Sequence, residues 1–142
     1  MAAISQTLGA QTLTREQRLQ MLDTYVTWAV MTGAPDCMER GLRHAEELRG
    51  ELPDQPTIKG SFGSMLIEAG RLEEGEAVLR DAYETDTVAF DRGIIAAYIG
   101  RACFLRGDRT EADRWFELSR QADPEGIPLE RFLREKEKGQ TL

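Results

Sequence analysis

The chain holds few side chains that could do chemistry. Its one histidine is His44, and its two cysteines are Cys37 and Cys103. Cys37 follows Asp36 at the expected beginning of a helix, a position where a thiol can become more reactive. No general base or orienting carboxylate accompanies it in a recognisable pattern. We therefore expect two reduced thiols that pack as small apolar groups, and a His44 that faces solvent or packs between helices.

Motifs for bound phosphate, metal or calcium are missing from the sequence. It contains no GxxxxGK[ST], no HExxH, no DxDxDG loop and no CxxC pair. The segment Gly60–Gly63 has no strand before it and no second glycine set, so close helix packing explains it better than a nucleotide loop. The carboxylate runs Glu46–Glu47 and Glu73–Glu74 stand among basic residues at helical spacing, which is typical of solvated faces. We expect no enzyme activity, no cofactor and no metal site.

The composition indicates one acidic, soluble domain. The 142 residues include 18 Lys and Arg against 25 Asp and Glu, so the net charge is −7, with 41% hydrophobic and 30% charged residues. A negative chain repels phosphate backbones and anionic membrane surfaces, so we expect no nucleic-acid and no membrane partner. Residues 1–13 do not read as a secretory signal, so we expect a flexible lead there. A reducing, cytoplasmic compartment suits the two cysteines.

Glycine, proline and capping residues divide the rest of the chain into helices. Thr14 with Gln17 has the pattern of a capping box, and Asp36 and Asp108 stand at the expected beginnings of two later helices. No alternating strand pattern persists, so we expect an all-α fold of about seven helices in antiparallel hairpins. The expected single domain, residues 14–138, consists of hairpins at about 14–50, 56–85 and 87–122 and a capping helix at 128–138, followed by a tail at 139–142.

An internal repeat of 37 residues underlies this pattern. Gly33, Gly70 and Gly107 recur at that spacing at the turns within the hairpins, where a positive φ or a close chain reversal favours glycine. Gly63 and Gly100 stand seven residues before the last two, where a small residue lets the two helices of a hairpin pack tightly. Hairpins that cannot bury their apolar faces alone stack into a continuous core. We therefore expect a short superhelical solenoid, with an irregular helical bundle as the alternative.

These positions resemble the tetratricopeptide repeat (TPR) family between about Arg15 and Pro124. The last repeat carries the resemblance best, through Ala96, Ile99, Gly100, Cys103, Gly107, Glu111, Ala112, Phe116, Asp123 and Pro124. The middle repeat has Gly75 where the family has alanine and Thr87 where it has proline, and it keeps Phe62, Gly63, Leu66, Gly70, Glu74, Leu79 and Ala82. The first repeat departs most, since Tyr25–Val26 replaces the family's Leu-Gly and an insertion follows Gly33. The resemblance implies a protein-binding module in which the last helix is a polar cap.

In that family the first helices of successive hairpins line a concave groove. Carried over position by position, the resemblance implies that a partner is bound by Asp23, Thr27, Val30, Met31, Ser64, Ile67, Glu68, Ala97, Tyr98, Arg101, Phe104 and Leu105. Asp23 and Glu68 make this lining acidic, which favours a basic or amphipathic segment of the partner. The Lys and Asn side chains with which one family variant holds a peptide carboxylate are absent, so that mode of recognising chaperone tails is not expected.

The helix at 87–106 has more apolar residues than its core face needs. The surplus residues on its other faces are Ile94, Ile95, Tyr98, Phe104 and Leu105. A helix that is apolar all round is either buried on every side or covers a partner. Two alternatives follow. The last helix folds back over these residues through Leu129 and Phe132, or they receive a peptide to which Arg101 donates a hydrogen bond.

Three functions remain open at this point. The first is a non-enzymatic module that binds a peptide or helix of another protein, as an adaptor or as a chaperone that shields hydrophobic segments. The second is a structural self-assembly module, a homodimer through the apolar face of the helix at 87–106. The third is an enzyme that uses Cys37, which predicts selective alkylation of that thiol near neutral pH.

Overall fold

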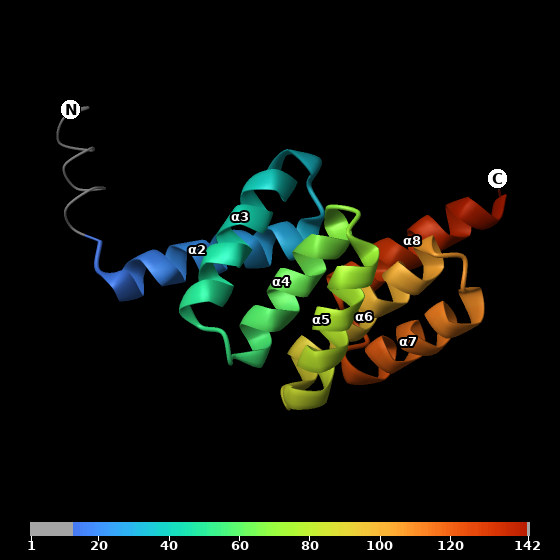
Figure 1. Ribbon diagram of the computed structural model, residues 1–142. Coiled ribbons are helices and arrows are strands. Elements are labelled where there is room, and N and C mark those ends of the chain that lie inside the picture. Colours follow the sequence, from blue (N-terminus) through green and yellow to red (C-terminus); the bar gives the residue numbers. More distant parts are fainter. Residues whose placement is uncertain (1–12, 142) are drawn as a thin grey trace.

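The computed structural model describes residues 13–141, and their side chains as far as Lys138 (Figure 1). This part of the chain is all-α and has no strand, which confirms the expected fold class. The expected lead at residues 1–13 lies outside the described residues except for its last position. The elements are α2 (Arg15–Thr32), a 3-10 turn η1 (Pro35–Cys37), α3 (Met38–Glu51), α4 (Pro56–Glu68), α5 (Leu72–Thr85), α6 (Ala89–Leu105), α7 (Arg109–Ala122) and α8 (Ile127–Thr141).

Two helices begin at the capping residues that the sequence predicts. At α2 the Thr14 hydroxyl accepts a hydrogen bond from the Gln17 N–H at 3.1 Å, and the Thr14 N–H donates to the Gln17 side chain at 2.9 Å. Both bonds of a capping box are therefore present. At α7 the Asp108 carboxylate accepts from the Glu111 N–H at 3.1 Å. These side chains satisfy N–H groups that the first helical turn leaves unpaired.

The prediction that Asp36 caps the second helix was wrong. The residues inserted after Gly33 form η1, in which Pro35 occupies the first turn and Asp36 the middle. α3 begins only beyond this turn, at Met38, and the preceding Cys37 makes no side-chain capping bond. The insertion therefore adds a short turn of its own instead of lengthening the helix.

The three repeated turn glycines have the backbone conformation that their spacing predicts. Gly33, Gly70 and Gly107 have φ values of 64°, 83° and 89°, and no other described residue has a positive φ. At Gly70 and at Gly107 the glycine N–H donates to the carbonyl three residues back at 3.0 Å. The N–H of the following residue, Arg71 or Asp108, donates to the carbonyl five residues before it, at 2.9 Å in both hairpins. The last two hairpins thus turn in the same way.

Gly63 and Gly100 bring the two helices of a hairpin into contact. A methyl group added to Gly63 would lie 2.7 Å from Leu79 Cγ and 3.2 Å from a carbonyl oxygen of α5. One added to Gly100 would lie 2.6 Å from the Phe116 ring and 3.3 Å from a carbonyl oxygen of α7. The partners of Gly100 stand 37 residues after the partners of Gly63. The repeat in the sequence is therefore also a repeat of tertiary contacts.

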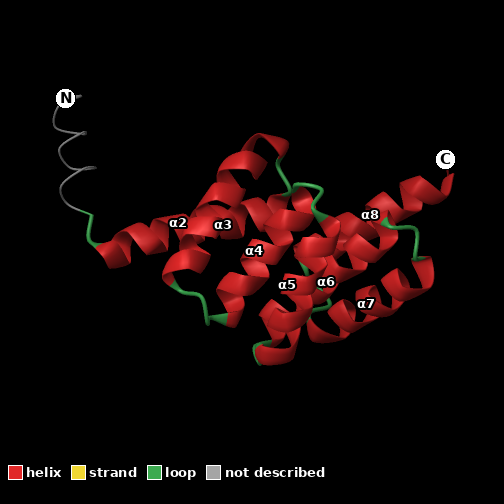
Figure 2. Cartoon of the chain, viewed as in Figure 1, coloured by secondary structure: helices red, strands yellow, loops and turns green. Residues whose placement is uncertain are grey.

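The helices pack in the order in which they occur, joined by short loops (Figure 2). Each of α2 to α7 contacts the next, and the first helices of the hairpins also contact one another, α2 with α4 and α4 with α6. In the view of Figure 1, α2, α6 and α8 lie behind α3, α5 and α7. One hydrophobic core runs through the hairpins, and its fully buried side chains include Leu48, Met65, Leu79 and Ile99.

The last helix returns along the first helices of the hairpins. α8 packs on α6, α2 and α7, and its residues Leu129 and Phe132 are buried in the core. Pro128 stands in its first turn, where the missing N–H costs no hydrogen bond. α8 continues to Thr141, so the described residues of the expected tail extend the helix.

Candidate functional site

The middle of α6 is covered from within the chain. Ile95 and Tyr98 are fully buried, and so is Phe132 of α8. The rings of Tyr98 and Phe132 meet edge to face, with their centroids 4.8 Å apart and their planes at 80°. The middle of α6 therefore follows the first of the two alternatives, in which the last helix folds back over it. The self-assembly hypothesis used the same face of α6, of which α8 covers the middle while Leu105 stays exposed.

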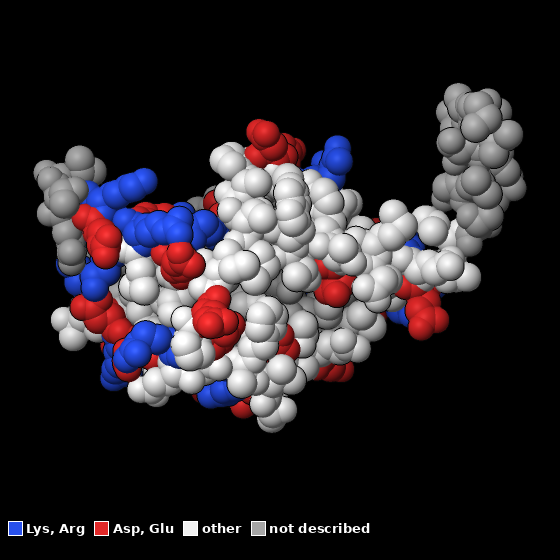
Figure 3. All heavy atoms as spheres, turned by 180° about the vertical axis from the view of Figure 1, so that it is seen from behind, with Lys and Arg blue, Asp and Glu red and all other residues white. Residues whose placement is uncertain are grey.

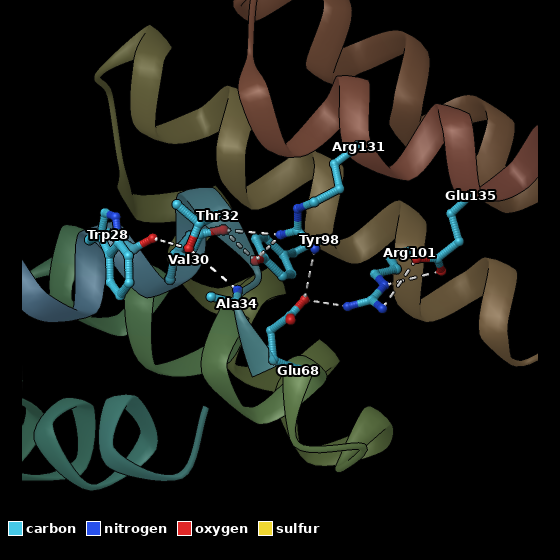
Figure 4. A network of polar contacts seen from close by, with 9 residues as sticks. All are labelled: Trp28, Val30, Thr32, Ala34, Glu68, Tyr98, Arg101, Arg131 and Glu135. Atoms are coloured by element: carbon cyan, nitrogen blue, oxygen red, sulfur yellow. Dashed lines mark hydrogen bonds and ion pairs between the residues drawn. The ribbon is translucent and has the colours of Figure 1, made fainter. Parts of the chain in front are cut away.

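A buried tyrosine fixes α8 to the end of α2 (Figure 4). The Tyr98 hydroxyl donates to the Val30 carbonyl over 2.7 Å and accepts from Arg131 of α8 over 2.9 Å. Arg131 also donates to the Val30 carbonyl at 3.1 Å. Burial, together with the nearby Glu68 carboxylate, raises the pKa of the Tyr98 hydroxyl, so it stays protonated and remains a donor. The turn at Gly33 belongs to this contact, because an added methyl group there would overlap the Arg131 guanidinium.

Two expected binding residues pair with one another instead of facing solvent. The Arg101 guanidinium forms an ion pair with Glu68 of α4, whose side chain is nearly buried. Arg101 also contacts Glu135 of α8 at 3.3 Å, and Arg131 lies 3.6 Å from Glu68 (Figure 4). The negative charge of Glu68 is therefore matched within the chain. Arg101, which sequence reasoning offered as a donor to a peptide, connects α4, α6 and α8.

Three more residues of the expected lining lie inside the structure. Ser64, Ile67 and Ala97 are all buried. The Ser64 hydroxyl donates to the carbonyl four residues earlier in α4, at 2.8 Å, so its bonding capacity is used within its own helix. Ile67 packs on α5, since a methyl group at Gly75 would lie 2.7 Å from its Cδ1 atom. These side chains contribute to the core between the hairpins.

The open part of the concave side lies at the other end of the first helices. There α2, α4 and the beginning of α6 surround an apolar hollow of about 110 Å³ that opens to solvent. This apolar hollow is lined by Thr27, Val30, Met31, Thr57, Gly60, Ser61, Phe90, Asp91, Ile94 and Ile95. Thr27, Val30 and Met31 belong to the expected binding set. Phe90 and Asp91 were missed, because the repeat pattern assigns no lining role to the first turn of α6.

A wider, more polar hollow adjoins the apolar one. It has a volume of about 610 Å³ and follows the seam between α2, α3 and α4, with Thr57 in the lining of both. Asp23, another residue of the expected set, lines it together with Gln20. The two hollows share Thr57 and both lie along α2, so we take them together as the candidate site and call them the groove.

Three aspartates stand near the junction of the two hollows, and we call Asp23, Asp86 and Asp91 the aspartate cluster. The Thr57 hydroxyl donates to Asp91 over 2.9 Å and fixes its carboxylate at the rim of the apolar hollow. Burial raises the pKa of Asp91, the Thr57 bond opposes this, and the charges of Asp86 and Asp23 raise the pKa further. Burial also raises the pKa of Asp23. Asp91 therefore lies close enough to Asp86 and Asp23 for their charges to disfavour its own.

The remaining expected residues lie at the far end of α6. Phe104 is half-buried and Leu105 is 46% exposed. Figure 3 views the face formed on the side of α2, α6 and α8: charged side chains gather toward the C-terminal end, and the middle is mostly uncharged. The outer side of α2 also exposes Met21 and Trp28, which the sequence pattern did not single out.

The reactive residue types are placed as packing groups. Cys37 and Cys103 are both buried and unpaired, and burial raises the pKa of the Cys103 thiol. His44 lies edge to face on Tyr25 with their ring centroids 5.1 Å apart, and burial lowers its pKa. Within residues 13–141 no three or more His, Cys, Asp and Glu side chains are placed to hold a metal ion. No helix in the same range has both the length and the apolar run that crossing a bilayer requires.

Fold and groove together define the molecule as a set of antiparallel helical hairpins, with an open groove at one end of its first helices and a helix across the other end. No protein-family model, no curated protein and no solved structure matches the chain.

Proposed function

We propose that this protein binds a segment of another polypeptide in the open groove along α2, and that it does so without chemistry of its own. One observation carries the proposal: an apolar hollow remains open between α2, α4 and α6, although α8 covers the middle of α6. Phe90, 49% exposed at its edge, is a large apolar side chain without full cover in the folded chain. Open apolar hollows with a polar rim are the usual form of a binding site.

The size of the apolar hollow indicates what it receives. An engineered cavity of about 150 Å³ holds a benzene molecule. A hollow of about 110 Å³ therefore has room for one side chain of a partner rather than for a cofactor. The rest of the segment would lie along the wider hollow beside Asp23 and Gln20. The acidic groups at the rim favour a basic or amphipathic segment.

The internal repeat supports the same class of function. Gly63 with Leu79 and Gly100 with Phe116 make equivalent contacts 37 residues apart, as stacked hairpins of a helical repeat protein do. We propose that the chain is a short TPR-like array, closed at its C-terminal end by α8, which works as an adaptor or as a chaperone. In such arrays the first helices form the surface that binds partners, and here the part of that surface that remains open is the groove.

The proposal is tested with peptides selected from a random library displayed on phage. The dissociation constant of a selected peptide is measured by fluorescence anisotropy for the wild-type chain, for Phe90→Ala and for Leu105→Ala. Phe90 and Leu105 lie at opposite ends of α6 and are about equally exposed, so Leu105→Ala is a matched control. Loss of a partly buried aromatic contact costs about 1–3 kcal/mol, so Phe90→Ala should weaken binding about fivefold or more.

The control should keep the wild-type affinity. If both variants bind every selected peptide as the wild type does, the groove is not the binding site. The oligomeric state, measured by light scattering on the same samples, is expected to be monomeric at these concentrations, since α8 covers the middle of α6.

A further inference from the structure

Carboxylates that are sheltered from solvent in this chain generally have a cation beside them. Glu51, Glu68, Glu76, Glu111 and Glu135 each form an ion pair with an arginine. The aspartate cluster differs, because none of its three carboxylates forms an ion pair with a residue in the described part of the chain. Three sheltered negative charges thus stand together without the neutralising partner that the other sheltered carboxylates have.

An arginine, Arg92, lies next to this cluster in the sequence but does not form an ion pair with it. Arg92 follows Asp91 directly, yet its guanidinium donates to the backbone carbonyls of Tyr83 and Asp86 and lies over the Tyr83 ring, 3.8 Å from its centroid. Arg92 therefore fixes the loop between α5 and α6 and leaves the carboxylates free of a cation.

Asp86 has a buried carboxylate oxygen without a partner, which is an observation separate from the missing ion pairs. Its residue is only 4% exposed, and its Oδ1 atom accepts from the Val88 N–H over 2.9 Å, which holds the beginning of α6. Its Oδ2 atom is buried and has no hydrogen-bond partner among the described residues. The Asp86 carboxylate is a direct neighbour of the Asp91 carboxylate, whose pKa its charge and a side-chain contact raise. Buried acceptors without a partner are rare and disfavoured.

The position of Asp91 relates this charge to the apolar hollow. Its carboxylate lines the hollow together with Thr57, and Phe90, Ile94 and Met31 form the apolar wall beside it. A ligand that fits both parts has an unbranched apolar stem ending in a cation. A lysine side chain has that form, since its four methylene groups pack on apolar surface while its ammonium group stays at a polar edge.

Resting on the proposed groove function, we propose that the aspartate cluster binds the ammonium group of a lysine in the partner segment. The ammonium donates to the Asp91 carboxylate at the rim, and the charges of Asp23 and Asp86 add to the attraction. The stem of the lysine fills the apolar hollow against Phe90 and Ile94. Arginine suits the place less, because its planar guanidinium needs a wider slot and a bidentate carboxylate geometry.

The test uses the phage-display library already described, selected in parallel on the wild-type chain, on Asp91→Asn and on Glu73→Gln. Asp91→Asn removes the charge and keeps an oxygen that can accept from Thr57. Glu73→Gln removes the same charge at the opposite end of the hairpins, where Glu73 lines a surface hollow with Arg106. Peptides selected on the wild type and on Glu73→Gln should be enriched in lysine, and those selected on Asp91→Asn should not.

Affinities of one selected peptide complete the test. Asp91→Asn should weaken its binding about tenfold or more, and replacement of the peptide lysine by norleucine should cost the same. The two changes together should cost little more than either alone, since each removes the same contact. Thermal unfolding of each variant shows whether the fold is intact.

The remaining outcomes separate a failure of the lysine site from a failure of the proposed groove function. Peptides that lose affinity with Phe90→Ala but show no lysine and no loss with Asp91→Asn would overturn the lysine site and leave the groove in place. Enrichment of arginine in place of lysine would also overturn it. Peptides that are insensitive to Phe90→Ala would overturn the proposed function itself, because the groove would then not be the binding site.

Discussion

Substitution of Gly100 by alanine tests how the hairpins are built. The added methyl group would lie 2.6 Å from the ring of Phe116 and 3.3 Å from a backbone carbonyl oxygen of α7. Phe116 is buried, so its ring has little room to move aside. Crowding of this kind in a packed core costs about 1–3 kcal/mol. The better helix propensity of alanine returns about 1 kcal/mol, so we expect a net loss of up to about 2 kcal/mol in the free energy of unfolding.

Gly50→Ala is the matched control for this substitution. Gly50 lies in the last turn of α3, and a methyl group added there has nothing within 4 Å. Alanine should therefore stabilise the chain by up to about 1 kcal/mol through helix propensity alone. The assay is urea denaturation followed by far-UV circular dichroism, and the two midpoints should move in opposite directions from the wild-type value.

A second variant separates crowding from other effects. When Phe116 is first replaced by alanine, the ring that meets the new methyl group is gone, and Gly100→Ala should then cost much less than it does in the wild type. Equal stabilisation by Gly100→Ala and Gly50→Ala would refute the reasoning, because α6 and α7 would then not be in the close contact that the repeat requires.

Three further predictions concern the polar contacts and the thiols. Tyr98→Phe removes the buried hydroxyl that bonds to the Val30 carbonyl and to α8, and should cost about 1–3 kcal/mol in urea denaturation. Asp91→Asn should stabilise the fold at neutral pH: the raised pKa of Asp91 means that the folded chain holds this proton more tightly than the unfolded chain. Stability linked to Asp91 is therefore full at low pH and falls as pH rises through that pKa, so the advantage of the variant in thermal unfolding should disappear in acid. Cys37 and Cys103 should both react slowly with iodoacetamide in the folded chain, since both are buried. The labelling is followed by mass spectrometry, and fast labelling of Cys37 alone would support the hypothesis of a reactive thiol.

The parts of the fold that depend on local backbone conformation and helix capping could be predicted from the sequence. Gly70 and Gly107 end their helices with positive φ, and only glycine adopts that conformation without strain, so their spacing was informative. Thr14 and Asp108 cap helices through bonds to residues three positions on. Asp36 has the same local pattern, but Pro35 and the insertion after Gly33 place it inside η1.

The candidate site could be predicted only in part, because it depends on contacts between distant segments. The sequence pattern left open whether α8 covers α6, and only the packing of Phe132 on Tyr98 decides where it lies. Glu68 was expected to make the groove acidic, but Arg101 and α8 neutralise it. The acidic character comes instead from Asp91 and its neighbours, which the turn between α5 and α6 brings beside Thr57. No periodicity within one helix carries that information.

The central claim is that a polypeptide segment binds in the open groove along α2, and mapping the bound surface by NMR tests it most directly. Backbone amide signals of the 15N-labelled chain are recorded with and without a peptide selected on the wild type. The proposal predicts the largest shifts at residues that line the apolar hollow, Thr27, Thr57, Gly60, Phe90 and Ile94. Shifts confined to the outer side of α2 around Met21 and Trp28, or to α8, would contradict it.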